Sequence, residues 1–129
     1  MRAAALLSLI ALGLASPAFA FEMKPYDAKS FAAAQAAGKA VVIDVTAPWC
    51  PTCKAQHRVF DELKGKPELA EVTIYEVDFD SQKDVLKSFK VVNQSTLIAF
   101  NGTHETGRVA GETKVDAIEW LLKGSTYKQ

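Results

Sequence analysis

The segment that decides the fold is residues 40–54, AVVIDVTAPWCPTCK. Its first six residues are apolar and mostly β-branched apart from one aspartate, which predicts a strand buried on both faces. The following Ala-Pro-Trp predicts a turn, and a helix is expected from Cys50 to about Lys64, ended by Gly65. The Cys-x-x-Cys motif therefore lies at the start of a helix that directly follows a buried strand, and this context favours a redox motif.

Helices and strands alternate on both sides of this segment. Further helices are expected at residues 27–37, 81–89 and 113–123, and further strands at 72–78, 96–100 and 103–110, with a weak strand signal at 22–25. Asn101-Gly102 predicts a hairpin between the last two strands. This order indicates an α/β fold with a central mixed sheet flanked by helices on both faces, to which the hairpin adds one antiparallel strand.

The first twenty residues differ from the rest of the chain. Arg2 precedes an apolar stretch from Ala3 to Ala15, and Ala18-Phe19-Ala20 follows as an A-x-A pattern. This combination predicts a secretory signal peptide, residues 1–20, cleaved after Ala20 and followed by one domain of residues 21–129. The alternative is an uncleaved anchor helix, but the apolar stretch is short for a bilayer core of about 30 Å. We therefore expect export to the periplasm.

The charges of the chain balance, with 15 Lys+Arg against 15 Asp+Glu. A protein that binds nucleic acid would normally carry a basic surplus, so we expect no nucleic-acid partner. No run of like charge indicates a disordered tail.

Cys50 and Cys53 are the only cysteines, and an oxidising compartment would allow a disulfide between them. As a structural staple that closes a loop of about four residues, this disulfide would contribute only ~2 kcal/mol, so a reversible redox couple is the better interpretation. A helix N-terminus favours an anion, which indicates Cys50, on the outer rim, as the attacking thiolate. Cys53, one turn later and more buried, would resolve the mixed disulfide. Pro51 fits the first turn, where its missing N–H costs nothing.

The sequence around the cysteines resembles the thioredoxin superfamily. Residues 42–54, VIDVTAPWCPTCK, are similar to the family's strand and active-site segment, with Trp directly before Cys-x-x-Cys and Asp six residues before the first cysteine. Residues 95–102, STLIAFNG, resemble the family's later strand and hairpin. The resemblance covers nearly all of residues 21–129. With the predicted signal peptide, the chain looks most like the small periplasmic thioredoxin-like proteins, and it is also similar to the soluble C-terminal domain of the membrane thiol electron transporter.

This resemblance implies a thioredoxin fold and a monomeric protein thiol–disulfide oxidoreductase, with no cofactor beyond the redox-active Cys50–Cys53 disulfide and no resident metal. It also implies that Asp44 is the buried carboxylate behind the resolving cysteine. An acid in an apolar strand needs a partner or a role, so we expect Asp44 to accept the proton of Cys53. The partner protein is expected to contact a surface formed by Trp49, Pro51, Thr52, Gln94 and Ser95.

Three positions depart from the family pattern. The residues between the cysteines are Pro51-Thr52, not the Gly-Pro of thioredoxin or the Pro-His of the strong periplasmic oxidant, so the direction of electron flow stays open. Ser95 stands where the family has a cis-proline, and the ~3 kcal/mol cost of a cis non-proline bond favours a trans Gln94–Ser95 bond without deciding it. The Ser95 hydroxyl is a candidate donor to the Cys50 sulfur. Arg58 replaces a kinking proline, which favours a straighter helix.

Within redox chemistry we favour a reductant or electron relay, which would receive electrons from a membrane thiol electron transporter and pass them to an oxidised periplasmic protein through a mixed disulfide. Candidates for that protein are cytochrome c maturation factors, peroxide or methionine-sulfoxide repair proteins and copper-stress proteins. An oxidant or isomerase acting on exported chains is the first alternative. A second is a Cu(I)- or other metal-handling protein that uses Cys50, Cys53 and His57, which recur at i, i+3 and i+7. A third is a binding module with a vestigial disulfide.

Overall fold

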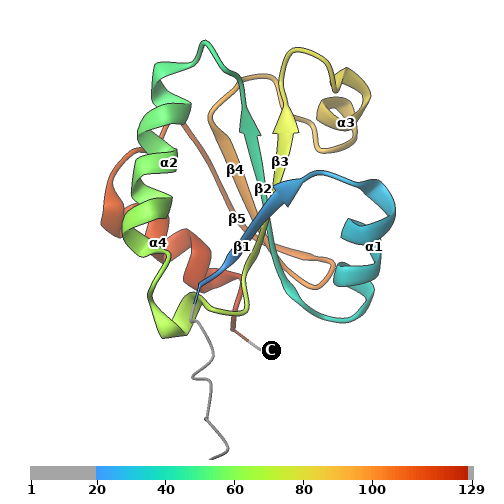
Figure 1. Ribbon diagram of the computed structural model, residues 1–129. Coiled ribbons are helices and arrows are strands. Elements are labelled where there is room, and N and C mark those ends of the chain that lie inside the picture. The colour runs from blue at the N-terminus through green and yellow to red at the C-terminus, as the bar shows by residue number, and fades with distance from the viewer. Residues whose placement is uncertain (1–19, 128–129) are drawn as a thin grey trace, which may run out of the picture.

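The strand β2 (Ala40–Thr46) lies at the centre of a five-stranded sheet. The structure is a computed structural model that describes residues 20–127, so the predicted signal peptide falls outside the described residues except for Ala20. The sheet has the order β1-β3-β2-β4-β5 (Figure 1). The other strands are β1 (Glu22–Pro25), β3 (Thr73–Asp78), β4 (Thr96–Asn101) and β5 (His104–Ala110). The helices are α1 (Ala28–Ala36), α2 (Pro51–Leu63), α3 (Lys83–Ser88) and α4 (Val115–Gly124), with a 3₁₀ turn at Pro67–Leu69.

The sheet is mixed, as predicted, because β4 runs against its neighbours. It pairs antiparallel with both β2 and β5, whereas β1 and β2 both pair parallel with β3. The hairpin therefore contributes β4 as the antiparallel strand of the described sheet, and β5 runs in the same direction as β1, β2 and β3. The hairpin prediction is also confirmed, since Asn101 pairs with His104 across the turn. Gly102 takes a φ of 56° there, a conformation that glycine adopts without strain.

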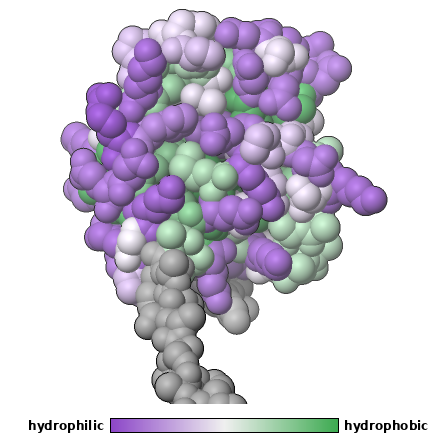
Figure 2. All heavy atoms as spheres, viewed as in Figure 1, coloured by the Kyte–Doolittle hydropathy of each residue, from purple (hydrophilic) through white to green (hydrophobic). Residues whose placement is uncertain are grey.

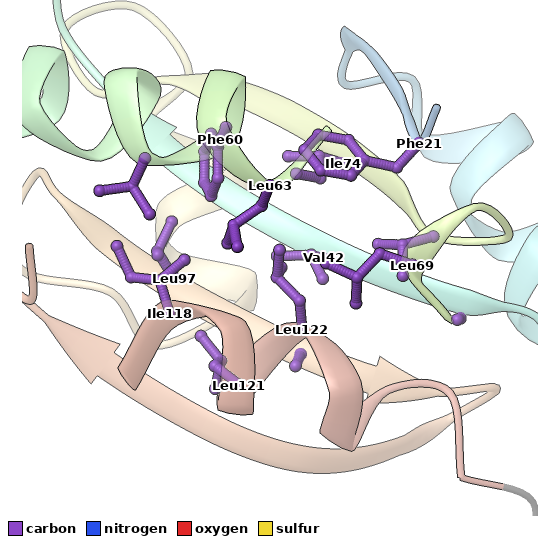
Figure 3. Packing of buried hydrophobic residues seen from close by; sticks show 14 residues of the cluster. Phe21, Val42, Phe60, Leu63, Leu69, Ile74, Leu97, Ile118, Leu121 and Leu122 are labelled. Atoms are coloured by element: carbon purple, nitrogen blue, oxygen red, sulfur yellow. The ribbon is translucent and has the colours of Figure 1, made fainter. Parts of the chain in front are cut away.

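Helices cover both faces of the sheet, which confirms the predicted layer arrangement. The cluster on one face is built with α2 and α4, and the cluster on the other with α1 and α3 (Figure 1). On the first face, Phe60 and Leu63 of α2 meet Ile118, Leu121 and Leu122 of α4 over the sheet (Figure 3). These five side chains are at most 1% exposed. Their burial holds α2 against the sheet and so fixes the position of its first turn.

Side chains of β2 alternate between the two faces of the sheet. Val41, Ile43 and Val45 belong to the cluster under α1 and α3, whereas Val42 packs in the cluster under α2 and α4. Residues 40–45 are all buried, so the prediction of a strand buried on both faces is confirmed. Asp44 shares the parity of Val42, and the alternation therefore delivers a carboxylate into the core beneath α2.

The ends of two helices show how local groups set the boundaries. Cys50 is the N-cap of α2, and the helix continues through Arg58 to Leu63 without a break. α3 begins at Lys83, two residues later than the sequence predicts. Its N-cap is Gln82, whose side chain accepts the N–H of Asp78 and forms no cap hydrogen bond.

The outer surface seen in Figure 2 is mostly hydrophilic, with hydrophobic side chains exposed in patches between the polar ones. Among the described residues, no helix has the length and apolar content needed to cross a bilayer. Three large aromatic side chains of the described residues stay exposed, Trp49 at 55%, Tyr127 at 69% and Trp120 at 72%.

Candidate active site

The two cysteines form a disulfide at the N-terminal end of α2. After β2 the chain turns at Ala47, whose carbonyl accepts the N–H of Cys50 at 3.1 Å. The Cys50 sulfur accepts the N–H of Cys53 at 3.1 Å, so an amide that the helix leaves unpaired points at it. Pro51 occupies the first turn of the helix, as predicted. In this arrangement a helix N-terminus stabilises a thiolate.

Cys50 does not lie on an exposed rim, because both cysteines are 1% exposed. The expectation that Cys53 is the more buried of the two is therefore wrong. The two cysteines are bonded to each other and pack against Ala47 and Phe79. What distinguishes the sulfurs is their polar contacts. The Cys50 sulfur faces an N–H donor, whereas the Cys53 sulfur lies 3.9 Å from the carbonyl oxygen of Val45, which favours a thiol over a thiolate.

Asp44 is fully buried, as predicted, and its partner is His57 of α2. The imidazole Nε2 and the carboxylate Oδ2 are 2.7 Å apart, while Oδ1 is buried without a hydrogen-bond partner among the described residues. Cys53 and His57 are one turn apart on α2 and contact consecutive residues of β2, Val45 and Asp44. Asp44 therefore lies under the face of α2 that carries Cys53 and His57.

His57 lies at the boundary between core and solvent, with its side chain 34% exposed. The hydrogen bond with Asp44 raises the pKa of His57 above its ordinary value of 6.5 and outweighs burial, which acts in the opposite direction. The negative charges of Asp44, Glu76 and Asp61 add to the rise. The ring also stacks on Phe60, with centroids 5.7 Å apart. These contacts favour an imidazolium that is fixed in position.

A pocket of about 380 Å³ opens beside His57. It lies between the end of β2, the first turns of α2 and the strand β3, and the residues that line it include Pro48, Lys54, His57, Glu76, Asp78 and Gln82. The imidazole thus borders the pocket and at the same time bonds the buried Asp44. His57 joins the buried carboxylate to a space that solvent can enter.

The Gln94–Ser95 bond is trans, since the described residues contain no cis peptide bond. Ser95 takes a φ of 57°, an uncommon conformation for a residue with a side chain. Its N–H donates to the Val45 carbonyl at 2.8 Å, the same carbonyl that faces the Cys53 sulfur. Ser95 is therefore held beside the disulfide, at the position where the family resemblance places it.

The Ser95 hydroxyl does not donate to the Cys50 sulfur, contrary to the expectation from the sequence. It donates instead to the carbonyl of Gln94 at 2.6 Å, because the preceding peptide group offers an acceptor next to it. The Ser95 carbonyl accepts the side-chain N–H of Gln56 at 3.0 Å, and the same Gln56 nitrogen donates to the Glu112 carbonyl at 3.0 Å. Gln56 is fully buried and ties α2 to this loop. Helix periodicity places Gln56 on the inner face but does not reveal which backbone groups it meets.

Trp49 is held in place although it is exposed. Its indole N–H donates to the Asp80 carboxylate at 2.8 Å, and its ring packs edge-on against Phe79 with centroids 6.4 Å apart. Of the side chains predicted to meet a partner, those at least partly exposed are Trp49, Pro51, Thr52 and Gln94. Ser95 is 7% exposed, and its N–H and carbonyl are bonded inside the protein, so this residue offers a partner little surface.

His57 and the two cysteines do not come together as a ligand set for a soft metal ion. The sulfurs are bonded to each other, and the groups gathered around His57 are the carboxylates of Asp44 and Glu76, with polar atoms of the three side chains within 4.8 Å of one another. Within residues 20–127, neither cysteine belongs to such a group of three. The contact between His57 and Asp44 is one feature of the site that the sequence did not predict, because thirteen positions separate the two residues.

Comparison with known proteins agrees with this geometry. A family model described as thioredoxin matches residues 22–123, and the chain belongs to the thioredoxin family. It is 36% identical over 93 residues to an H-type thioredoxin of Brassica campestris, and the aligned residues cover 72% of this chain and 74% of that protein. Its structure is similar to that of Trxlp from Edwardsiella tarda, with 40% identity, a TM-score of 0.75 and coverage of 78% of this chain and 98% of that one. A thioredoxin of Malassezia sympodialis, at 22% identity and a TM-score of 0.69 over 84% of this chain and 95% of that one, shares the fold.

The protein is thus a thioredoxin-type thiol–disulfide oxidoreductase with the Cys50–Cys53 disulfide in its Cys-x-x-Cys motif. Its substrates are proteins, which it engages through mixed disulfides. The predicted thioredoxin fold is confirmed.

Restoring the family's proline at position 95 is expected to destabilise this protein. Ser95→Pro removes the N–H that bonds the Val45 carbonyl and imposes a φ near −65° where the chain has +57°, so we expect a loss of at least about 2 kcal/mol. Ser95→Gly, the matched control, keeps the N–H and permits the positive φ, and should change the free energy of unfolding by less than about 1 kcal/mol. Urea unfolding followed by tryptophan fluorescence measures both. A Ser95→Pro variant as stable as the parent would contradict the backbone geometry described here.

Proposed function

We propose that the protein is an exported reductant or electron relay in which Cys50 attacks the disulfide of a partner protein and Cys53 resolves the complex. One observation carries the assignment of the two cysteines: the Cys50 sulfur accepts an N–H at the start of α2, whereas the Cys53 sulfur faces a carbonyl oxygen. An N–H stabilises a thiolate, and a carbonyl oxygen stabilises a thiol that can donate to it. In the reduced protein Cys50 is therefore the nucleophile, and Cys53 keeps its proton until the resolving step.

The reduction of a partner disulfide proceeds in two exchanges. The Cys50 thiolate attacks one sulfur of the partner, forms a mixed disulfide and releases the other partner sulfur as a thiolate. The Cys53 thiol then transfers its proton to Asp44, and the resulting thiolate attacks the Cys50 sulfur. The Cys50–Cys53 disulfide forms, and the second partner sulfur leaves as a thiolate. The partner gains two electrons, and its two thiolates take up protons from solvent.

Asp44 suits the proton-accepting step because of its place beneath α2. Its Oδ2 is occupied by His57, but Oδ1 is buried and has no partner among the described residues. A buried carboxylate oxygen without a donor is costly, so a proton arriving there is favourable. The Cys53 sulfur lies 3.9 Å from the backbone oxygen of Val45, the residue next to Asp44 on β2.

The partner protein is proposed to bind across the disulfide between Trp49 and the loop that carries Gln94. Trp49, Pro51 and Thr52 offer exposed or partly exposed surface on one side of the sulfurs. On the other side, the N–H and carbonyl of Ser95 are already bonded inside the protein. An extended partner segment that lies along this loop would therefore pair with the backbone of Gln94 and not with that of Ser95.

We favour reduction over oxidation because Pro51 and Thr52 supply no imidazole that would further stabilise the Cys50 thiolate. A less stabilised reduced form makes the dithiol a better electron donor. The electrons would come from a membrane thiol electron transporter and pass to an oxidised periplasmic protein. The opposite direction, in which the disulfide oxidises exported chains or helps to isomerise them, is the alternative that the reduction potential distinguishes.

Export is supported by the basic start, apolar stretch and A-x-A end of residues 1–20. Packing of the domain begins directly after this segment. Ala20 is exposed, whereas Phe21 is 2% exposed and meets Phe60 edge-on, with ring centroids 6.3 Å apart. Cleavage after Ala20 would therefore leave the core of the domain intact.

Cys53→Ser is expected to accumulate a mixed disulfide through Cys50, because the serine hydroxyl cannot make the resolving attack. Cys50→Ser, the matched control, leaves a thiol that faces the Val45 carbonyl and should trap at least about tenfold less complex. Non-reducing electrophoresis after incubation of each reduced variant with insulin measures the trapped complex. More complex with Cys50→Ser than with Cys53→Ser would reverse the roles of the two cysteines.

The equilibrium reduction potential of the Cys50–Cys53 pair is expected to lie close to that of thioredoxin, about −270 mV. Equilibration with dithiothreitol or glutathione mixtures, followed through Trp49 fluorescence, measures it. The strong periplasmic oxidant has a potential of about −120 mV. A value close to that one would show that the disulfide form is an oxidant and would refute the proposed direction.

Expression of the full chain in a bacterium with an outer membrane is expected to give a periplasmic protein whose first residue is Phe21. Ala18→Lys places a charge in the A-x-A pattern and should leave residues 1–20 attached. Cell fractionation and intact-mass measurement of both proteins test this. Recovery of the unprocessed parent chain from the cytoplasm would refute export.

A further inference from the structure

The Asp44–His57 pair joins the core beneath α2 to the pocket beside this helix. We propose that His57 is a proton-relay residue: it compensates the charge of Asp44 while Cys53 is a thiol, and it releases a proton into the pocket when Asp44 takes the proton of Cys53. His57 does not touch the reacting sulfurs and is a positioning residue that acts through Asp44. The inference rests on the proposed roles of Asp44 and Cys53.

The contact between Asp44 and His57 defines the outer part of the route, and the placement of Cys53 on α2 defines its start. The Cys53 sulfur and the His57 ring project from adjacent turns of α2 onto consecutive residues of β2. Asp44 bonds His57 through Oδ2 at 2.7 Å, and its Oδ1 is left for a second donor. His57 borders the pocket and is 34% exposed, whereas Asp44 has no exposure of its own. A proton from Asp44 therefore has a path to solvent along the imidazole.

Charge compensation gives the pair its function. With Asp44 ionised and His57 an imidazolium, the pair is neutral. With Asp44 protonated and His57 an uncharged imidazole, the pair is neutral again. The fully buried carboxylate thus changes its protonation state without leaving an uncompensated charge in the core, which would be costly.

The surroundings of His57 favour its charged form. The charged groups around the ring and its pocket come from each element packed there: Asp44 from β2, Glu76 and Asp78 from β3, and Asp61 and Lys54 from α2. Carboxylates outnumber the one ammonium, and the pKa of His57 is raised above 6.5, first through its hydrogen bond with Asp44. The imidazolium is therefore complete well below that raised pKa and is lost as the pH rises through it.

The proton balance of the resolving step follows. The Cys53 thiol and the Asp44 carboxylate become a Cys53 thiolate and an Asp44 carboxylic acid, and the His57 imidazolium loses one proton to solvent in the pocket. The Cys53 thiolate then displaces the partner thiolate from Cys50, as described above. The proton that Asp44 has taken then passes to His57, which restores the imidazolium that the contacts of the disulfide form favour. When the electron donor reduces the disulfide again, the pair gives one proton to Cys53 and takes one from solvent.

Stopped-flow fluorescence with oxidised glutathione tests the relay. Reduced protein mixed with excess oxidised glutathione gives a second-order phase, the attack of Cys50, and a first-order phase, the resolution by Cys53. Both rate constants are measured from pH 5 to pH 9 for the parent chain and its variants. Tryptophan fluorescence reports the reaction, and circular dichroism verifies that each variant is folded.

Two substitutions at His57 separate the two parts of the relay. His57→Gln keeps an amide for Asp44 but no charge, so the acid limb of the resolution rate should move up by about one pH unit, with a fall of about tenfold at pH 6. His57→Lys keeps a cation that does not release its proton at neutral pH, so the limb should stay near that of the parent while the plateau falls about tenfold. His104→Gln, at the hairpin end of the sheet, is the matched control and should change neither rate constant.

The outcomes distinguish this proposal from the function on which it rests. An unchanged resolution profile in His57→Gln, or an equal slowing of attack and resolution at every pH, would overturn the relay. Trapping of insulin by Cys53→Ser depends on Cys50 and not on His57. That experiment therefore tests the proposed function independently of the relay.

An independent measurement requires no variant at His57. The imidazole of His57 in the parent protein, followed by NMR, should titrate above pH 6.5, and its midpoint should fall in Asp44→Asn because the carboxylate that stabilises the imidazolium is gone. A His57 that titrates below pH 6.5, or one that is indifferent to Asp44→Asn, would overturn the proposal.

Discussion

The burial of β2 on both faces is the constraint on which the site depends. Because side chains alternate along a strand, β2 sends Val41, Ile43 and Val45 to one side of the sheet and Val42 and Asp44 to the other. A fully buried carboxylate needs compensation, and α2, held down by Phe60 and Leu63 on the same face, supplies it through His57. The same packing fixes the first turn of α2 and with it the position of the disulfide.

The backbone carbonyl of Val45 links the loop that carries Ser95 to Cys53. It accepts the N–H of Ser95 and lies 3.9 Å from the Cys53 sulfur, so the loop and Cys53 meet at one backbone oxygen. Gln56 adds a second tie by donating to the Ser95 carbonyl from within α2. These bonds hold the loop beside the disulfide with a trans Gln94–Ser95 bond and a positive φ at Ser95, where the family has a cis-proline.

The electrostatics of the site separate two tasks. Local groups distinguish the sulfurs, because Cys50 meets the N–H of the helix start and Cys53 meets a carbonyl oxygen. The buried charge of Asp44 is compensated by a different group, His57, which borders the pocket. Attack and resolution can therefore depend differently on pH, although the two cysteines are bonded to each other in the oxidised protein.

The sequence by itself determined the order of helices and strands, the buried strand, the hairpin and the cysteine pair at a helix start. These features depend on hydrophobic periodicity, on turn residues and on helix-end groups, which act between residues close in the chain. Asp44 was also recognisable, since a charge in an apolar strand stands out from its neighbours.

Only the tertiary structure decided which groups meet across elements. The pairing of His57 with Asp44, the tie from Gln56 to the Ser95 loop, the equal burial of the two cysteines and the inward bond of the Ser95 hydroxyl are contacts of this kind. Each depends on how α2 is rotated over the sheet and how the loop turns. The packing of the whole core sets both of these, and no local pattern in the sequence contains them.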